Sequence, residues 1–182
     1  NLWFARGDAT ATGQRGASFD IVFSRALIHH LATPEPMVAE AVRLLRPGGI
    51  LIIQDRTVED VLRPASPSHL RGYFFERYPR LIETERERRP ATETVVAAMA
   101  SAGLVGIETV TLSEPRRRYE SVSELQDDLR ARTGRSILHA LSDEELDDLI
   151  AYITARVTHA MPIQEADHWT IWCATRPCHQ PT

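Results

Sequence analysis

The sequence predicts an α/β fold built on a parallel sheet, and three observations indicate it. Residues 19–55 read as a strand, a helix, a tight turn and a second strand, which is one βαβ unit. Further strand and helix patterns follow along the rest of the chain. The chain has 182 residues, of which 43% are hydrophobic and 25% charged, as expected for a globular domain with a buried core.

The first part of the chain contains the clearest elements. Residues 2–5 read as the end of a strand that enters a turn. Residues 19–24 (FDIVFS) form an apolar, β-branched run suited to a buried parallel strand. The apolar spacing of 34–45 predicts a helix, and RPGG at 46–49 ends it, because proline cannot continue a helix and glycine permits a positive φ. Residues 50–53 (ILII) are the second apolar strand.

The middle of the chain, residues 56–90, is interpreted as irregular. It contains an aromatic cluster at 73–78 and a charged run at 83–89. The aromatic side chains either pack locally or contact a substrate. The charged run is interpreted as the solvated face of a helix.

The last part of the chain alternates helical and strand patterns. Ser142 followed by Glu145 is a capping box that predicts a helix start. The predicted elements are helices at 92–102, at 123–133 and from 142 onward, and strands at 107–112 and 168–175.

Polar side chains follow the predicted strands. They are Asp8 with Ala9, then Ser24 and Arg25 leading to His29 and His30, and finally Asp55. Ligands of open parallel sheets bind outside the carboxyl ends of the strands, so these residues are expected along one edge. Other interpretations stay open: Asp8 can be a turn residue, and either histidine can cap or pack beside the helix.

Several motifs together resemble a known family. GDA at 7–9, FDIVFSRALIHHL at 19–31 and RLLRPGGILIIQD at 43–55 resemble, in order and spacing, the downstream half of class I S-adenosylmethionine-dependent methyltransferases. The resemblance implies a Rossmann-like methyltransferase sheet. In it, AGL at 102–104 leads to the sixth strand and HWTIWCATRP at 168–177 is the final antiparallel strand.

The resemblance also implies a cofactor and the residues that hold it. The cofactor is S-adenosyl-L-methionine, which supplies the chemistry. Asp8 and Ala9 are expected beside the adenine ring, with the Asp8 carboxylate accepting from the exocyclic amine. Ser24 and Arg25 are expected to border the methionine part.

The acceptor side is implied in the same way. His29 and His30 are expected near the acceptor, and one of them is the expected catalytic base. Asp55 is expected to contact the substrate, although it could also serve as the base, and Tyr73 and Phe74 are expected as further substrate contacts. The corresponding domain organisation over 1–182 is a partial methyltransferase domain with a substrate lid at 57–90 and a helical insertion at 114–166.

The most diagnostic part of the family pattern is missing from the sequence. The family has a glycine-rich loop after its first strand, whereas none of the nine glycines here opens a helix in a G-x-G pattern after a strand. We therefore expect a sheet that lacks its first two strands, truncated at the N-terminus, with independent activity in doubt. Residues 19–24 would then form an exposed apolar edge that favours self-association into a homo-oligomer.

Composition narrows the expected partners. The 21 basic and 25 acidic residues give a formal charge of -4, which offers no footprint for a phosphate backbone. We therefore predict methyl transfer to a small-molecule acceptor in the cytoplasm, without nucleic-acid or membrane partners. No metal is predicted, because Cys173, Cys178 and His179 lack a fourth ligand for zinc.

Two other functional classes remain open. The missing glycine loop supports a non-catalytic interaction module derived from a methyltransferase domain. A nicotinamide-dependent oxidoreductase would need G-x-G-x-x-G after a strand, which the sequence lacks.

Overall fold

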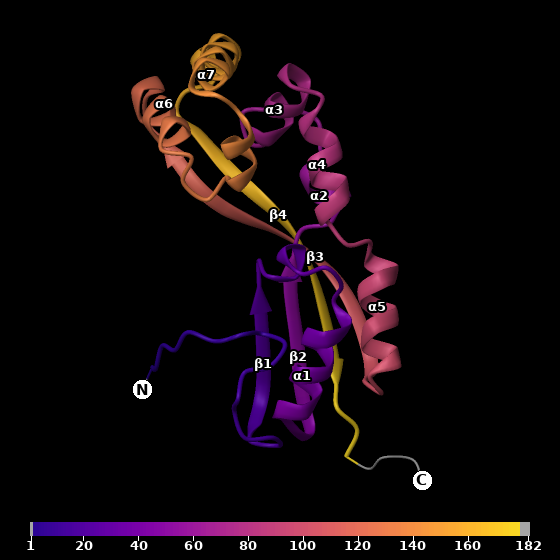
Figure 1. The fold of residues 1–182 in the computed structure, drawn as a ribbon. Helices are drawn as coiled ribbons and strands as arrows, with labels where there is room; N and C mark the ends of the chain where they lie inside the picture. The colour runs from indigo at the N-terminus through magenta and orange to yellow at the C-terminus, as the bar shows by residue number, and fades with distance from the viewer. Residues whose placement is uncertain (1, 179–182) are drawn as a thin grey trace. The chain divides into compact units, whose positions relative to one another are not determined.

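The computed structural model describes residues 2–178, whose elements are labelled in Figure 1. The strands are β1 (Phe19–Arg25), β2 (Leu45–Asp55), β3 (Val105–Tyr119) and β4 (Ile163–Thr175). The α-helices are α1 (Glu35–Leu44), α2 (Val58–Val61), α3 (Arg71–Arg77), α4 (Leu81–Arg88), α5 (Thr92–Ser101), α6 (Val122–Arg130) and α7 (Asp143–Val157). Single-turn and short 3₁₀ helices lie at Ile28–His30, Ser136–Ala140 and Thr158–Ala160.

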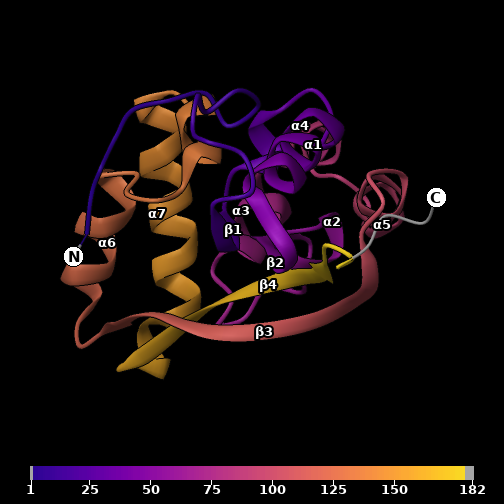
Figure 2. The same cartoon turned by 90° about the horizontal axis from the view of Figure 1, so that it is seen from below.

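The strands of the described part form one mixed sheet in the order β1-β2-β4-β3. β1 and β2 are parallel, with Ile21 opposite Ile50, and α1 connects them, which confirms the predicted βαβ unit. β4 runs antiparallel to β2, with Thr170 opposite Asp55, which confirms the predicted final antiparallel strand. Figure 2 shows β3 beside β4. The α/β class predicted from the sequence is therefore confirmed.

The chain divides into two compact units, and the first contains the βαβ unit. Its described residues are 2–57, 90–111 and 170–178. Leu51 and Ile53 of β2 and Trp172 of β4 are fully buried in its core. Val38 of α1 and Met99 of α5 complete this core with no exposed surface. The predicted helix at 92–102 is thus α5, which packs beside α1.

The residues predicted as a glycine turn, 46–49, lie within β2, which begins at Leu45 and shifts its register against β1 over this stretch. α1 ends at Leu44, and Gly48 has a φ of 82°, a conformation that glycine adopts without steric cost. A Cβ atom on Gly49 would lie 2.9 Å from the main-chain oxygen of Arg46. Both glycines are therefore required by the backbone path that aligns β2 with β1.

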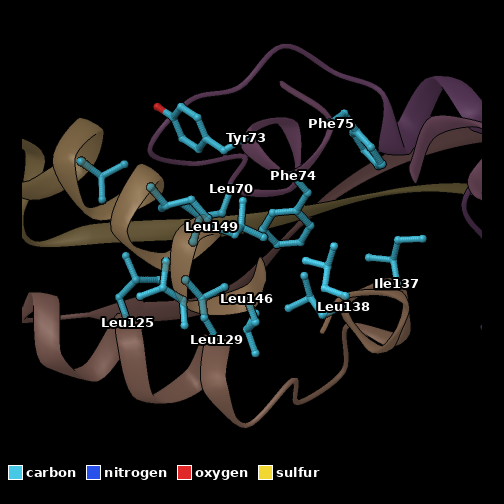
Figure 3. Close-up of a cluster of buried hydrophobic side chains, with 14 of the residues drawn as sticks. Leu70, Tyr73, Phe74, Phe75, Leu125, Leu129, Ile137, Leu138, Leu146 and Leu149 are labelled. Atoms are coloured by element: carbon cyan, nitrogen blue, oxygen red, sulfur yellow. The ribbon is translucent and has the colours of Figure 1, made fainter. Parts of the chain in front are cut away.

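The second unit combines residues 58–89 and 112–169 around its own core. Figure 3 shows Leu125 and Leu129 of α6 facing Leu146 and Leu149 of α7. Phe74 of α3 lies in the same core and has no exposed surface. The segments expected as a lid and as a helical insertion therefore share one hydrophobic core.

Two expectations for residues 56–90 are wrong. The segment is not irregular, because α2, α3 and α4 lie within it. The charged run is not wholly solvated either, since Glu85 has no exposed surface and Arg89 is 6% exposed. Arg71, Arg88 and Arg89 all form ion pairs with the Glu85 carboxylate, and this charge balance permits its burial. Arg88 and Arg89 follow Glu85 at helical spacing, which is a signal for pairing, whereas the contact with Arg71 and the burial have no such signal in the sequence.

A second buried charge cluster lies between β3, α6 and β4. Arg135 pairs with Asp128 and, at 2.7 Å, with Glu165. The Tyr119 hydroxyl donates to Asp128 Oδ2 at 2.7 Å, and Arg116 Nη1 lies 2.8 Å from Glu165 Oε2. Positive and negative side chains thus compensate one another inside the second unit.

The predicted strand at 2–5 is not formed. Leu2, Trp3 and Phe4 are 79%, 91% and 90% exposed, and within the described residues they pair with no strand. An extended segment becomes a stable strand only when a neighbour accepts its hydrogen bonds. β1, predicted as buried, instead lies at the edge of the sheet with Ile21 and Phe23 57% and 56% exposed, which confirms the exposed apolar edge.

The remaining elements agree with the sequence in type and differ in length. Ser142 and Glu145 form the predicted capping box at the start of α7, and α6 corresponds to the predicted helix at 123–133. β3 and β4 extend well beyond the predicted 107–112 and 168–175. Each of these strands contributes residues to both units, so pairing continues past the segment that the apolar pattern marks.

Candidate functional site

The candidate site begins at the turn that precedes β1. Asp8 and Ala11 form an isolated bridge, and Asp8 Oδ1 accepts hydrogen bonds of 2.8 Å from both the main-chain N–H and the hydroxyl of Thr10. Both bonds hold the pKa of Asp8 below its ordinary value, and the bond from the main-chain N–H has the larger effect. Asp8 is therefore a turn residue through its Oδ1 atom, as one of the two interpretations expected. Its Oδ2 atom accepts no hydrogen bond from the described residues.

Glu40 of α1 fixes the loop that follows this turn. Its Oε1 accepts from Thr12 N at 2.9 Å and from Thr12 Oγ1 at 2.5 Å. Arg43 donates to both Glu40 oxygens and also to the main-chain oxygen of Gln14. The hydrogen bonds from Arg43 and Thr12 lower the pKa of Glu40 to about 2. Sequence reasoning missed Glu40 and Thr12, although E-x-x-R at helical spacing was a signal for this contact.

Two adjoining hollows border this loop and share Ala9 and Thr12 among their lining residues. The more open one has a volume of about 310 Å³ and is also lined by Asp8. The second has a volume of about 170 Å³ and is also lined by Ser24 and Glu40. The structure therefore brings Asp8, Ala9 and Ser24 to one place. Arg25 is exposed and lines neither hollow.

Ser24 stands out among the lining residues because its hydroxyl is unsatisfied. The residue is 7% exposed, and its Oγ has no hydrogen-bond partner in the described part of the chain. Buried hydroxyls are normally hydrogen-bonded, so such an atom at a hollow indicates a place for a polar ligand atom.

His29 and Asp55 form a buried pair at the carboxyl ends of β1 and β2. The Nδ1 atom of His29 lies 2.8 Å from Asp55 Oδ1 and 2.9 Å from Oδ2. The main-chain N–H of His29 donates to Asp55 Oδ2 at 3.3 Å, and that of Arg56 to Oδ1 at 2.8 Å. Asp55 has no exposed surface and His29 is 8% exposed. The predicted meeting of these residues at one sheet edge is thus observed.

His30 lies beside His29 but in a different environment. The two ring centroids are 4.0 Å apart with an angle of 43° between the planes. His30 is exposed, whereas His29 is buried against the carboxylate. The two candidate bases therefore differ in exposure.

The aromatic residues expected to contact a substrate pack in the second unit. Tyr73 is 8% exposed and Phe74 fully buried, both within its hydrophobic core. Burial of Tyr73 raises the pKa of its hydroxyl. Local packing is thus what these side chains do in the structure, and their contact with a substrate stays a prediction.

No cluster of three or more side chains suited to a metal ion occurs within residues 2–178. Cys173 is half-buried and Cys178 exposed, both as free thiols, while His179 lies outside the described residues. In the same part of the chain, every helix is too short or too polar to cross a membrane.

Comparison with known proteins gives a family match over the part that carries this site. Residues 2–53 match the family model of a methyltransferase domain. A curated relative, tRNA (carboxymethyluridine(34)-5-O)-methyltransferase ALKBH8 of Macaca fascicularis, is 43% identical over 68 residues, which are 36% of this chain and 10% of that protein.

Solved structures share the fold at low identity. A putative methyltransferase from an antibiotic biosynthesis pathway of Anabaena variabilis superposes with a TM-score of 0.67 at 17% identity, over 95% of this chain and 72% of that one. Phosphoethanolamine N-methyltransferase 2 of Haemonchus contortus, in complex with phosphomonomethylethanolamine and S-adenosylhomocysteine, gives a TM-score of 0.50 at 19% identity. The chain spans 36% of that protein's length, and 93% of the chain is covered. The family match and the shared fold confirm the resemblance to class I S-adenosylmethionine-dependent methyltransferases.

Proposed function

We propose that these residues are part of an S-adenosylmethionine-dependent methyltransferase that acts on a small-molecule acceptor. The observation that carries this is the convergence of Asp8, Ala9 and Ser24 on two adjoining hollows within the segment that matches a methyltransferase domain. Because the chain spans 36% of one similar protein and 10% of another, we propose this activity for the protein that contains it.

The chemistry of the lining residues fits the cofactor. Asp8 Oδ2 is a carboxylate oxygen available to accept from an amine, and the Ser24 hydroxyl is a buried group able to donate or accept. Ala9 offers a small apolar surface between them. These three residues would hold the cofactor, whereas the exposure of Arg25 gives it no such position.

Within such an enzyme, the residues of this chain would orient the acceptor and take up the proton that it loses. When bound, S-adenosylmethionine supplies a methyl group activated by the positive sulfur. The protein must align the acceptor atom and exclude water. An acceptor that loses a proton also needs a base, and imidazole is well suited at physiological pH. We propose His29 or His30 for this role, at the carboxyl ends of the strands.

A small-molecule acceptor is favoured over nucleic acid by charge. Binding to a phosphate backbone relies on an excess of Lys and Arg, whereas this chain carries 21 basic and 25 acidic residues. The curated relative is named as a tRNA methyltransferase, so tRNA is the acceptor to test against this inference.

A non-catalytic interaction module is the second candidate, and one observation favours it. β1 leaves Ile21 and Phe23 more than half exposed at an open sheet edge. Apolar strand edges of this kind are ready to pair with another chain.

Calorimetry with S-adenosylhomocysteine distinguishes the two candidates. The titration is carried out on the 182-residue chain and on the complete polypeptide that its gene encodes. Saturable binding with one site per chain, in either sample, supports the methyltransferase. Absence of binding in both would overturn that function and favour the interaction module.

A further inference from the structure

We propose that Asp55 is a positioning residue that holds His29 in the tautomer protonated at Nδ1, which leaves the Nε2 lone pair to take a proton from the acceptor. This role rests on the proposed methyltransferase function. It assigns the base to His29 rather than His30, and it gives Asp55 a function other than substrate contact.

The hydrogen bonds around the Asp55 carboxylate determine the tautomer. His29 Nδ1 lies within 2.8 Å and 2.9 Å of the two carboxylate oxygens. An ionised carboxylate only accepts hydrogen bonds, so the proton of this contact belongs to Nδ1. The main-chain N–H groups of His29 and Arg56 donate to the same carboxylate. Asp55 is thereby fixed in place before it orients the ring.

The burial of Asp55 distinguishes between substrate contact and positioning of His29 as its role. The residue has no exposed surface, so an acceptor bound at the surface of the site does not touch it. His29 covers the carboxylate and retains 8% exposure. Asp55 therefore acts through His29, in the way that a buried aspartate orients the histidine of a serine hydrolase.

The same contact selects between the two neighbouring histidines. The ring of His29 is buried and held by the Asp55 carboxylate, with Nδ1 2.8 Å from Oδ1. His30 is exposed and stacks at a tilt on His29. A base must keep one orientation to accept a proton in line with the reaction, and the buried contact with Asp55 gives His29 such an orientation.

The assignment defines the class of acceptor as one whose attacking atom bears a hydrogen, such as a hydroxyl or an amine. As the acceptor's lone pair forms the bond to the methyl carbon, the sulfur retains the electrons of its broken bond and becomes neutral. The acceptor's proton passes to His29 Nε2, and the resulting imidazolium faces the Asp55 carboxylate until solvent removes the proton.

The test is the ¹⁵N spectrum of the imidazole nitrogens in the chain, recorded at a pH where they are neutral. We expect His29 with its proton on Nδ1, in contrast to the exposed His139 and His159, which serve as internal references in the common Nε2–H form. The variant Asp55→Asn should convert His29 to the Nε2–H form, because an amide can donate to Nδ1. Asp20→Asn, which neutralises an exposed carboxylate on β1, should leave the tautomer unchanged.

The wild-type spectrum decides the matter even if Asp55→Asn does not fold. A proton on His29 Nε2 in the wild type would overturn the inference, as would an unchanged tautomer in a folded Asp55→Asn variant. Calorimetry with S-adenosylhomocysteine on the same samples tests the proposed function separately. The Nδ1–H form in a protein that binds no S-adenosylhomocysteine, alone or as the complete polypeptide, would confine the pair to a structural role. The Nε2–H form in a protein that binds it would leave the methyltransferase proposal standing without this positioning.

Discussion

The hydroxyl of Ser24 is the single atom through which the cofactor site can be probed most sharply. It is buried and has no hydrogen-bond partner within the described residues, so removing it breaks no hydrogen bond there. We expect Ser24→Ala to weaken S-adenosylhomocysteine binding about 2- to 13-fold, as the loss of one hydrogen bond of about 0.5–1.5 kcal/mol does. Calorimetry of the variant in the form of the protein that binds measures this change.

The matched control for Ser24→Ala is Ser101→Ala, since Ser101 is exposed at the end of α5 in the same unit. It should bind S-adenosylhomocysteine as tightly as the wild type. Equal affinities for all three proteins would remove Ser24 from the cofactor site.

The residues that the sequence places after predicted strands lie close together in the structure, although the strand predicted before Asp8 is not formed and the roles of these residues stay predictions. Asp8, Ala9, Ser24, His29 and Asp55 were singled out by that position, and the structure gathers them in one unit. The pairing of His29 with Asp55 was not predictable, because it depends on the register that sets β1 against β2. The same holds for Glu40, whose partner Thr12 is 28 positions away in the sequence.

Among the elements, α7 has the most explicit start signal. The Ser142 hydroxyl accepts from Glu145 N at 3.2 Å, while the Glu145 carboxylate accepts from Ser142 N at 3.0 Å. We expect Ser142→Ala to lower the free energy of unfolding by about 1 kcal/mol, the usual contribution of an N-cap. Ser123→Ala, at an exposed position inside α6, should change it by less than about 0.5 kcal/mol. Urea denaturation of both variants tests this, and equal stabilities would show that the box contributes nothing.

We expect the chain to self-associate through the edge strand β1. Ile21 is 57% exposed on a strand whose outer side is unpaired in the described sheet. We expect concentration-dependent association that Ile21→Lys weakens by at least about tenfold, because a charge at such an edge opposes strand pairing. Sedimentation velocity over a concentration series measures it.

Val110→Lys is the matched control for the edge, since Val110 is 52% exposed on β3. It should leave association through β1 intact. A chain that stays monomeric throughout the series, or equal weakening by both substitutions, would contradict a role for β1.

Element types followed from local patterns, whereas element lengths did not. The apolar patterns of β2 and α7 are local signals, and both predicted elements are present. The residues predicted as a glycine turn, 46–49, belong to β2 instead. The charged run predicted as a helix face lies in α4, but the burial of Glu85 on that helix did not follow from the pattern, because it also depends on the ion pair with Arg71 of α3. The strand at 2–5 failed for the same general reason, since strands are defined by their neighbours.

For the molecule as a whole, buried carboxylates make stability depend on pH. Burial by itself raises the pKa of Glu85, but Arg88, Arg89 and Arg71 outweigh this and lower it from 4.5 to about 2. The carboxyl pKa in the folded state thus lies below that in the unfolded state. The stabilisation is fully present above about pH 4.5 and is lost as the pH falls toward 2. Asp128, lowered to about 2 by Arg135 and Tyr119 against the effect of burial, contributes in the same direction.

We therefore expect a free energy of unfolding that begins to fall below about pH 6.5, because burial lowers the pKa of His69 from 6.5 to about 4. It should fall further toward pH 2 as Glu85 and Asp128 become protonated. Glu85→Gln should lower it by about 3–5 kcal/mol at neutral pH, because three guanidinium groups lose their counter-charge. It should also make the acid dependence shallower. Glu83→Gln, on the exposed side of α4, should do neither. Denaturant titrations across the pH range provide the measurement, and an unaltered acid slope in Glu85→Gln would contradict this account.

Each of the two cores is built from segments that are far apart in the sequence, and this affects folding during translation. The second unit is assembled from 58–89 and 112–169, and the first from segments on both sides of them. Ile163 belongs to one core, and Trp172 and Ala174 belong to the other. Neither hydrophobic core can therefore be completed until these positions have been translated. Until then, the apolar side chains of the earlier segments stay exposed to solvent. Synthesis rate and chaperone supply, more than the final stability, should then govern the yield of folded protein.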